Sequence, residues 1–349
     1  MMGVRACILS ISGPELLKSE RNFLRQANPW GLILMGRSCE NREQLKRLCN
    51  EIRNCLGYDV LIFIDQEGGR VARLRPPHWP AFPPAAAFGD LYAANKADGL
   101  EAAYLGHRLI ADELRAMGIN ADCAPVCDLR VLATHDAIGD RAFSTSADAV
   151  KALAKRALKG LSDGGVQGCL KHMPGQGRAE ADSHYDLPKI TTNIAELDTD
   201  FDIFSELSGH ALMGMTGHVC YEAIAPGEPA TISDAIISGV IRQRIGFDGI
   251  LMTDDLGMNA LGDTLAVRGN RALAAGCDVL LHCSGFLKSP DDILAEMESV
   301  ADCAGELEGV SLARANKVTA GIGQPDEFDR DASRRRFSDL MHDRMSGVG

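Results

Sequence analysis

Eight short apolar segments recur along the chain, and polar stretches with a helical period separate most of them. The segments cover residues 6–11, 30–35, 60–64, 119–125, 166–170, 212–216, 249–252 and 278–282. Each is a continuous apolar run rather than an alternation of apolar and polar residues. Continuous runs are typical of strands that are covered on both faces, as in a parallel sheet. The pattern therefore predicts eight buried, parallel strands.

Helical periodicity fills the intervals between these segments. It is clearest over residues 41–55, 99–117, 147–162, 232–245, 265–275 and 290–304. Strand–helix alternation repeated about eight times predicts an α/β fold of the (β/α)8 TIM-barrel type. A doubly wound open sheet is the alternative, although it would normally contain fewer strands in 349 residues.

No low-complexity linker divides the chain, so we predict one catalytic barrel domain over residues 1–323. The sequence then becomes polar, and residues 324–349 are expected to form a charged C-terminal helix or tail. The densest basic cluster, Arg334 to Arg336, lies among acidic residues there. We interpret that cluster as a solvated helix face.

Composition narrows the range of partners and compartments. The net charge is −12 and no basic stripe is present, which argues against nucleic-acid binding. Eleven cysteines without a CxxC pair indicate a reducing compartment. The N-terminal apolar run is too short to span a membrane and lacks a convincing signal-peptide cleavage site. We expect a cytoplasmic monomer with no membrane partner.

Ionisable residues follow nearly every apolar segment. Because the C-terminal ends of barrel strands form the active site of such folds, these residues are the candidates for chemistry. They are Arg37, Asp65, Glu67, Arg70, Asp128, Arg130, Lys171, His172, His218, Asp254, Asp255 and His282.

Asp65 begins a glycine-containing segment that ends at Arg73. A carboxylate that accepts from sugar hydroxyls and an arginine that donates to them would form a clamp, with Gly68 and Gly69 allowing the backbone to turn. The alternative is a turn with a solvated charge cluster. Arg141 is a weaker candidate, because an arginine on a loop is often simply exposed.

Asp254 and Asp255 directly follow the apolar run 249–252. A carboxylate in this position could act as a nucleophile or a base. Aspartate is also a good N-cap, so the pair could instead begin the next helix, with Asp255 the better candidate for that role.

Lys171 and His172 end another apolar run, and Asp182 and His184 follow in a glycine-rich loop. A carboxylate two residues from a histidine would orient the imidazole and raise its pKa, forming an acid–base pair. An ordinary Asx turn is the alternative. No HxH, HxxxH or HExxH spacing occurs and Lys171 would repel a cation, so we predict neither a metal nor an organic cofactor.

Together these motifs resemble glycoside hydrolase family 3, in particular its single-domain bacterial β-N-acetylglucosaminidases of cell-wall recycling. The resemblance covers roughly residues 5–320, and its motifs occur in the family's order. They are Asp-Gln-Glu-Gly-Gly-Arg-Val at 65–71, Ala-Pro-Val-Cys-Asp at 124–128, Arg-Ala-Phe-Ser at 141–144, Lys-His-Met-Pro-Gly at 171–175, Asp-Ser-His at 182–184, Met-Thr-Gly-His-Val at 215–219 and Thr-Asp-Asp-Leu-Gly-Met at 253–258.

The resemblance implies specific roles for residues of this chain. Asp254 would be the nucleophile of a covalent glycosyl-enzyme, and His184, paired with Asp182, would be the general acid/base. The sugar ring of N-acetylglucosamine would be held by Asp65, Arg73, Arg141, Lys171 and His172. The chain departs from the family at Gln176, where a histidine is usual; glutamine cannot titrate, which leaves it only a supporting role.

The expected activity is that of a retaining β-N-acetylglucosaminidase. Its expected substrates are small carbohydrates, namely N-acetylglucosaminyl-1,6-anhydromuramic acid and muropeptides. A β-glucosidase or a glycoside phosphorylase of the same family is the alternative, and a catalytically silent sugar-binding protein is another.

Overall fold

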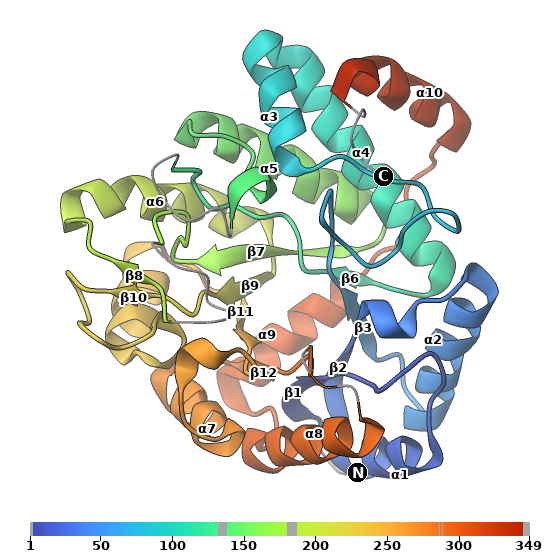
Figure 1. The fold of residues 1–349 in the computed structure, drawn as a ribbon, viewed down its shortest axis with the longest axis vertical. Coiled ribbons are helices and arrows are strands. Elements are labelled where there is room, and N and C mark those ends of the chain that lie inside the picture. Colours follow the sequence, from blue (N-terminus) through green and yellow to red (C-terminus); the bar gives the residue numbers. More distant parts are fainter. Residues whose placement is uncertain (1–2, 132–137, 180–186, 286, 288, 345–349) are drawn as a thin grey trace.

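The centre of the molecule is a closed barrel of parallel strands (Figure 1). The structure is a computed structural model that describes residues 3–131, 138–179, 187–285, 287 and 289–344. The barrel strands, in the order in which they pair, are β1 (Arg5–Leu9), β12 (Val279–Leu281), β11 (Ile250–Asp255), β9 (Met213–Thr216), β7 (Gln167–Met173), β6 (Ala121–Asp122), β3 (Leu61–Ile64) and β2 (Pro29–Leu34). All eight predicted strands are present. Because β1 pairs with both β12 and β2, the sheet closes, and the open-sheet alternative is wrong.

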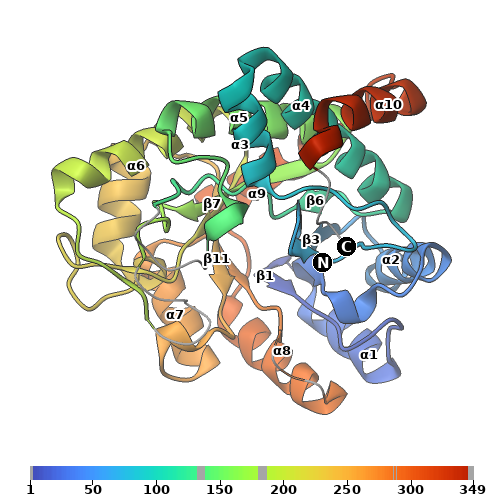
Figure 2. The same ribbon diagram turned by 45° about the horizontal axis from the view of Figure 1, so that its top comes forward.

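Helices form a ring around this barrel (Figures 1 and 2). The ring contains α1 (Lys18–Ala27), α2 (Arg42–Leu56), α4 (Lys96–Met117), α5 (Ala147–Asp163), α6 (Ile194–Leu207), α7 (Leu265–Ala275), α8 (Pro290–Ala304) and α9 (Gly309–Ala320). The helix predicted over 232–245 is a π-helix at Ala235–Arg244, preceded by a 3-10 turn at Ala230–Ile232. The pattern did not single out α6, α9 or the additional helix α3 (Ala85–Ala94).

Strand alternation divides the apolar residues into two layers. In β1, Ala6 and Ile8 belong to the cluster that fills the barrel, whereas Cys7 and Leu9 pack against the helices. Both layers are buried, because the barrel interior is filled by side chains and the helices cover the outside. This two-sided burial explains why the strands appear in the sequence as continuous apolar runs.

Two short pairs of strands lie outside the barrel sheet. β4 (Gln66–Gly68) and β5 (Val71–Ala72) form an antiparallel hairpin directly after β3. β8 (Lys189–Ile190) pairs in parallel with β10 (Cys220–Tyr221). The hairpin carries the residues between Asp65 and Arg73, so it fixes one side of the candidate site.

The C-terminal helix α10 (Arg330–Met341) packs against α4 (Figure 1). Glu113, on α4, is buried and forms ion pairs with Arg330 and Arg334. Arg334 is exposed, as the solvated-face interpretation predicted, but it also anchors the helix. The predicted boundary at residue 323 stays a prediction.

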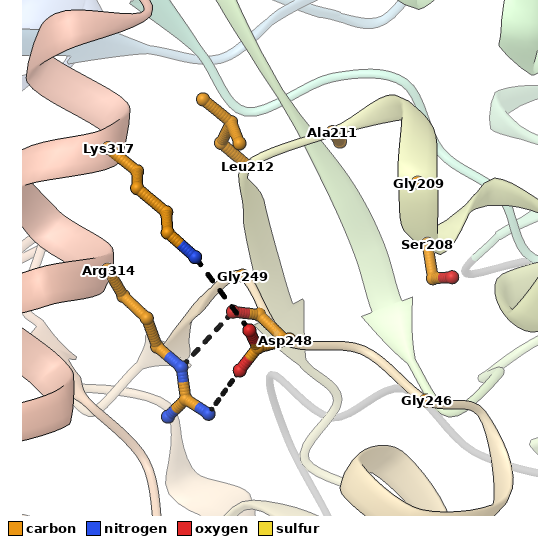
Figure 3. A pocket seen from close by; sticks show the side chains of 9 residues that line it. All are labelled: Ser208, Gly209, Ala211, Leu212, Gly246, Asp248, Gly249, Arg314 and Lys317. Atoms are coloured by element: carbon orange, nitrogen blue, oxygen red, sulfur yellow. Dashed lines mark hydrogen bonds and ion pairs between the residues drawn. The ribbon is translucent and has the colours of Figure 1, made fainter.

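A cavity of about 290 Å³ lies at the end of the barrel where the strands begin, which is the end away from the candidate site (Figure 3). The cavity is lined by Ser208, Gly209, Ala211, Leu212, Gly246, Asp248, Gly249, Arg314 and Lys317. Figure 3 shows that Arg314 and Lys317 both point toward Asp248, with Arg314 Nη2 at 2.8 Å and Lys317 Nζ at 3.8 Å from its carboxylate. None of the helices in the described ranges combines the length and the hydrophobicity of a membrane-spanning segment.

Candidate active site

Three of the predicted residues, Asp65, Lys171 and Asp254, lie at the C-terminal end of the barrel, on the strand face that points inward. Phe63, Cys169 and Met252 belong to the cluster inside the barrel, and side chains two residues apart share a face of a strand. Asp65, Lys171 and Asp254 each follow one of these residues at that spacing. The apolar run had placed Lys171 and His172 at the end of a strand, but β7 continues to Met173 and contains both.

Cys169 is buried inside the barrel, two residues before Lys171, and nearby charges affect the pKa of its thiol. Burial raises the pKa of the Cys169 thiol to about 12; Lys171 lowers this pKa, whereas Asp254 and Asp65 raise it further. The structure thus brings together residues that lie up to 189 positions apart (254 − 65).

Glu67 is the centre of a buried charge network. Its Oε1 lies 2.5 Å from Lys171 Nζ, and its two oxygens accept from Arg141 Nε and Nη2 at 2.8 Å each. Burial alone would raise the pKa of Glu67, but Arg141 and Lys171 outweigh it and hold this pKa well below its ordinary value. The network therefore keeps Glu67 ionised and fixes the positions of both cations.

Asp65 extends this network to the hairpin. Its carboxylate lies 2.9 Å from Arg73 Nη2 and 3.3 Å from Lys171 Nζ. The predicted clamp residues are thus in direct contact, and the alternative of a solvated turn is wrong for Asp65, which is largely shielded from solvent. In the sequence, Glu67 was one of the ionisable residues at the strand ends and part of the motif at 65–71, but it had no predicted role. Its position two residues after Asp65 was the signal that could have given it a role, because that spacing often places side chains on one side of the chain.

His172 is held by a carboxylate that the sequence indicated only as a strand-end residue. His172 Nδ1 lies 2.7 Å from Asp128 Oδ2, and Asp128 Oδ1 accepts from the backbone N–H of Gln176 at 2.6 Å. Asp128 is fully buried. This arrangement fixes the orientation of the imidazole and anchors the start of the loop after β7.

The adjacent carboxylates Asp254 and Asp255 have different environments. Asp254 Oδ1 accepts the N–H of Asp255 at 2.8 Å, and none of the described basic side chains forms an ion pair with it. Asp255 accepts the N–H groups of Gly257 and Cys283 at 2.9 and 3.0 Å. The helix-cap alternative is wrong, because Thr264 caps α7. Among the described residues, Asp254 therefore keeps a carboxylate oxygen without a hydrogen-bond or ion-pair partner at the C-terminal end of the barrel.

The predicted acid/base residues, Asp182 and His184, lie outside the described residues. Among the residues that are described, no group of three or more His, Cys, Asp or Glu side chains is arranged to hold a metal ion.

A (β/α)8 barrel has the features of a glycoside hydrolase site when the C-terminal ends of its strands carry a carboxylate without an ion-pair partner among the described residues, together with a network of buried acids and bases. Residues 7–316 match the family model of the glycosyl hydrolase family 3 N-terminal domain. The chain therefore belongs to glycoside hydrolase family 3, as the sequence motifs indicated, and it is a glycoside hydrolase.

Its relatives include proteins of very similar length. A beta-hexosaminidase of Chromobacterium violaceum is 37% identical over 97% of this chain and 96% of its own length. Another, from Thioalkalivibrio sulfidiphilus, is 36% identical over 91% of this chain and 89% of its own length.

Solved structures share the fold over nearly the whole chain. NagZ from Neisseria gonorrhoeae, in complex with N-trifluoroacetyl-D-glucosamine, has a TM-score of 0.80 and 29% identity, with 97% of this chain and 98% of that chain covered. A family 3 β-N-acetylglucosaminidase from a Paenibacillus species has a TM-score of 0.83 and 27% identity. The match covers 96% of this chain, but this chain spans only 66% of that longer protein.

Proposed function

We propose that this protein is a retaining β-N-acetylglucosaminidase that removes terminal β-linked N-acetylglucosamine from peptidoglycan fragments. The observation that carries the proposal is the Asp254 carboxylate, which has no ion-pair partner among the described residues. It lies at the same end of the barrel as the buried charge network of Asp65, Glu67, Lys171 and Arg141. The beta-hexosaminidase relatives and the glucosamine derivative bound by the Neisseria protein support N-acetylglucosamine as the sugar.

In the proposed reaction, Asp254 attacks the anomeric carbon and forms a covalent glycosyl ester. His184 donates a proton to the leaving oxygen, and Asp182 orients the imidazole. The neutral His184 then accepts a proton from water, which attacks the anomeric carbon and releases Asp254. The fixed ring of charges would hold the sugar hydroxyls and position the anomeric carbon for this attack.

Free cysteines support a reducing compartment for this activity. All eleven cysteines are free thiols in the structure, and nine of them are buried. We propose that the enzyme acts in the cytoplasm on muropeptides and N-acetylglucosaminyl-1,6-anhydromuramic acid.

The test compares p-nitrophenyl β-glucosaminides with and without the N-acetyl group. We expect efficient hydrolysis of the acetylated sugar, with the β-configuration retained in the first product seen by NMR. Release of sugar 1-phosphate in phosphate buffer would instead identify a phosphorylase. Absence of turnover with binding intact would indicate a sugar-binding protein.

A second measurement tests the acid/base assignment. His184→Ala should slow substrates with poor leaving groups far more than activated aryl glycosides, because only poor leaving groups need protonation. Asp182→Ala should act in the same direction but more weakly. Equal losses for both substrate types would contradict the assignment of His184.

A further inference from the structure

A buried histidine, His282, links the strand that carries Asp254 to a surrounding helix. His282 follows β12 and is fully buried. Its Nδ1 lies 3.2 Å from Asp255 Oδ1, at the end of β11, and its Nε2 lies 2.8 Å from Glu296 Oε2, on α8. The Nδ1–Asp255 contact is close enough for an ion pair but does not have the geometry of a hydrogen bond. An imidazole between two carboxylates is most stable when both nitrogens carry protons.

Asp255 is hydrogen-bonded to Asp254, so contacts that fix Asp255 also restrict Asp254. The Asp255 N–H donates to Asp254 Oδ1 at 2.8 Å, so the position of the Asp255 backbone sets the orientation of Asp254. His218 holds the same residue from the other side, since its Nε2 lies 3.0 Å from the Asp255 carbonyl oxygen. Gly257 leaves space for the contact: a Cβ there would come within 3.1 Å of both Asp255 Oδ1 and His282 Cε1.

We propose that His282 is a positioning residue: as an imidazolium held between Asp255 and Glu296, it fixes the end of β11 and thereby the Asp254 carboxylate. This inference rests on the proposed nucleophilic role of Asp254. It goes beyond the sequence motifs, in which His282 was only one polar residue among several at the strand ends.

The charged surroundings favour the protonated form. Although burial lowers the pKa of His282, the close carboxylates of Asp255 and Glu296 outweigh it and raise the pKa to about 9. The other titratable groups nearby are Arg268 on α7, Arg37 after β2 and the neighbouring Cys283; both arginines interact with Asp255. The imidazolium is thus present below about pH 9 and is lost as the pH rises through that value.

The test compares Glu296→Gln with Glu298→Gln. Both changes remove one negative charge from α8, but Glu298 is exposed and lies two residues away from the contact. Glu296→Gln removes a group that raises the His282 pKa, so the alkaline fall in kcat should move to lower pH. The Glu298→Gln profile should match the wild type. An activated aryl N-acetylglucosaminide is the substrate, because its cleavage needs no acid. An unshifted profile in Glu296→Gln would overturn the proposal.

Two further measurements separate positioning from a general loss of structure. His282→Gln should lower kcat roughly 10- to 100-fold with little change in KM, since misplaced reacting groups cost about this much. Histidine NMR, with His282→Gln used for assignment, should show an imidazole in the wild type that titrates well above the ordinary value. Titration of His282 near its ordinary value, or an unchanged kcat in His282→Gln, would overturn the proposal.

A 5-fluoro N-acetylglucosaminyl fluoride distinguishes this inference from the proposed function. Labelling of the wild type at Asp254, with slower labelling in His282→Gln, supports both. Failure to label Asp254 in the wild type would refute the nucleophile itself. Normal labelling of Asp254 at an equal rate in both proteins would refute only the role of His282.

Discussion

The two ends of the barrel use the same kinds of side chain for different purposes. At the N-terminal end, Asp278 is nearly fully buried and all its hydrogen-bonding needs are met from within the protein. It accepts from Arg242 at 2.7 Å, Arg314 at 3.1 Å, the Leu251 N–H at 2.8 Å and the Ser311 hydroxyl at 2.5 Å. This network ties β11, α9 and the π-helix together.

At the C-terminal end, the charges are equally fixed but less completely paired. Within the described residues, Asp254 accepts one hydrogen bond, from the backbone N–H of Asp255, while Lys171 and Arg141 form ion pairs with Glu67 at the same end of the barrel. A fully satisfied buried network stabilises the fold, whereas partly satisfied groups held rigidly are available to a ligand. The two ends therefore contain similar residues and differ in how many hydrogen bonds and ion pairs the described residues make to the buried carboxylates.

The largest effect should come from Asp254→Asn, which keeps the shape of the side chain and removes its nucleophilicity. We expect kcat to fall by about 10⁴-fold or more, with the midpoint of urea unfolding almost unchanged. The fluoro-sugar should label Asp254 in the wild type. Labelling of Asp255 would reverse the assignment of the two carboxylates.

Asp278→Ala should lower the stability of the protein and leave its activity almost unchanged, the reverse of Asp254→Asn. Arg242 would lose its only described carboxylate partner and stay largely buried, which typically costs about 3–5 kcal/mol of unfolding free energy. The kcat at 25 °C should stay within about twofold of the wild type if the variant is folded. Urea unfolding and turnover of the aryl substrate would check this, and a loss of kcat without destabilisation would contradict the comparison.

The fold could be predicted because each strand is buried on both faces. Continuous apolar runs such as 249–252 indicate this burial in the sequence, and the presence of eight such runs predicts an eight-stranded barrel. Strand limits were less predictable. β6 covers only Ala121–Asp122 of the predicted 119–125, where Pro125 lacks an N–H for the ladder. The π-helix at Ala235–Arg244 has an apolar pattern too close to that of an α-helix for periodicity to separate the two.

The site could be predicted as a set of residues but not as a set of contacts. The sequence pattern placed Asp65, Lys171 and Asp254 near the ends of strands, and the structure has them at the C-terminal ends of β3, β7 and β11; their roles stay predictions. Pairings such as Glu67 with Arg141, 74 positions apart, depend on how strands from distant parts of the chain meet. No local pattern contains that information, and the same is true of the His282 contact with Glu296 on α8.

A smaller effect is expected from Lys171→Ala. Lys171 is buried, pairs with Asp65 and Glu67 and is a proposed sugar-binding residue, so its loss should lower kcat/KM roughly 10- to 100-fold. If Lys171 positions the sugar as well as binding it, KM should rise and kcat should also fall. Michaelis–Menten analysis of the aryl substrate measures both. A change in KM alone would show that Lys171 contributes only to binding.

The smallest effect should come from Lys317→Ala, the matching change at the N-terminal end. Lys317 is also a lysine beside a carboxylate, but its side chain is 63% exposed and its Nζ lies 3.8 Å from Asp248. An exposed pair of this kind contributes about 0.5 kcal/mol or less, because water screens it. Arg314 continues to neutralise Asp248 in this variant. We therefore expect unchanged kcat and KM and a barely detectable shift in urea unfolding. A loss of activity comparable to that of Lys171→Ala would mean that the N-terminal cavity is coupled to catalysis. The number of partners of each buried charge would then not explain the different roles of the two ends.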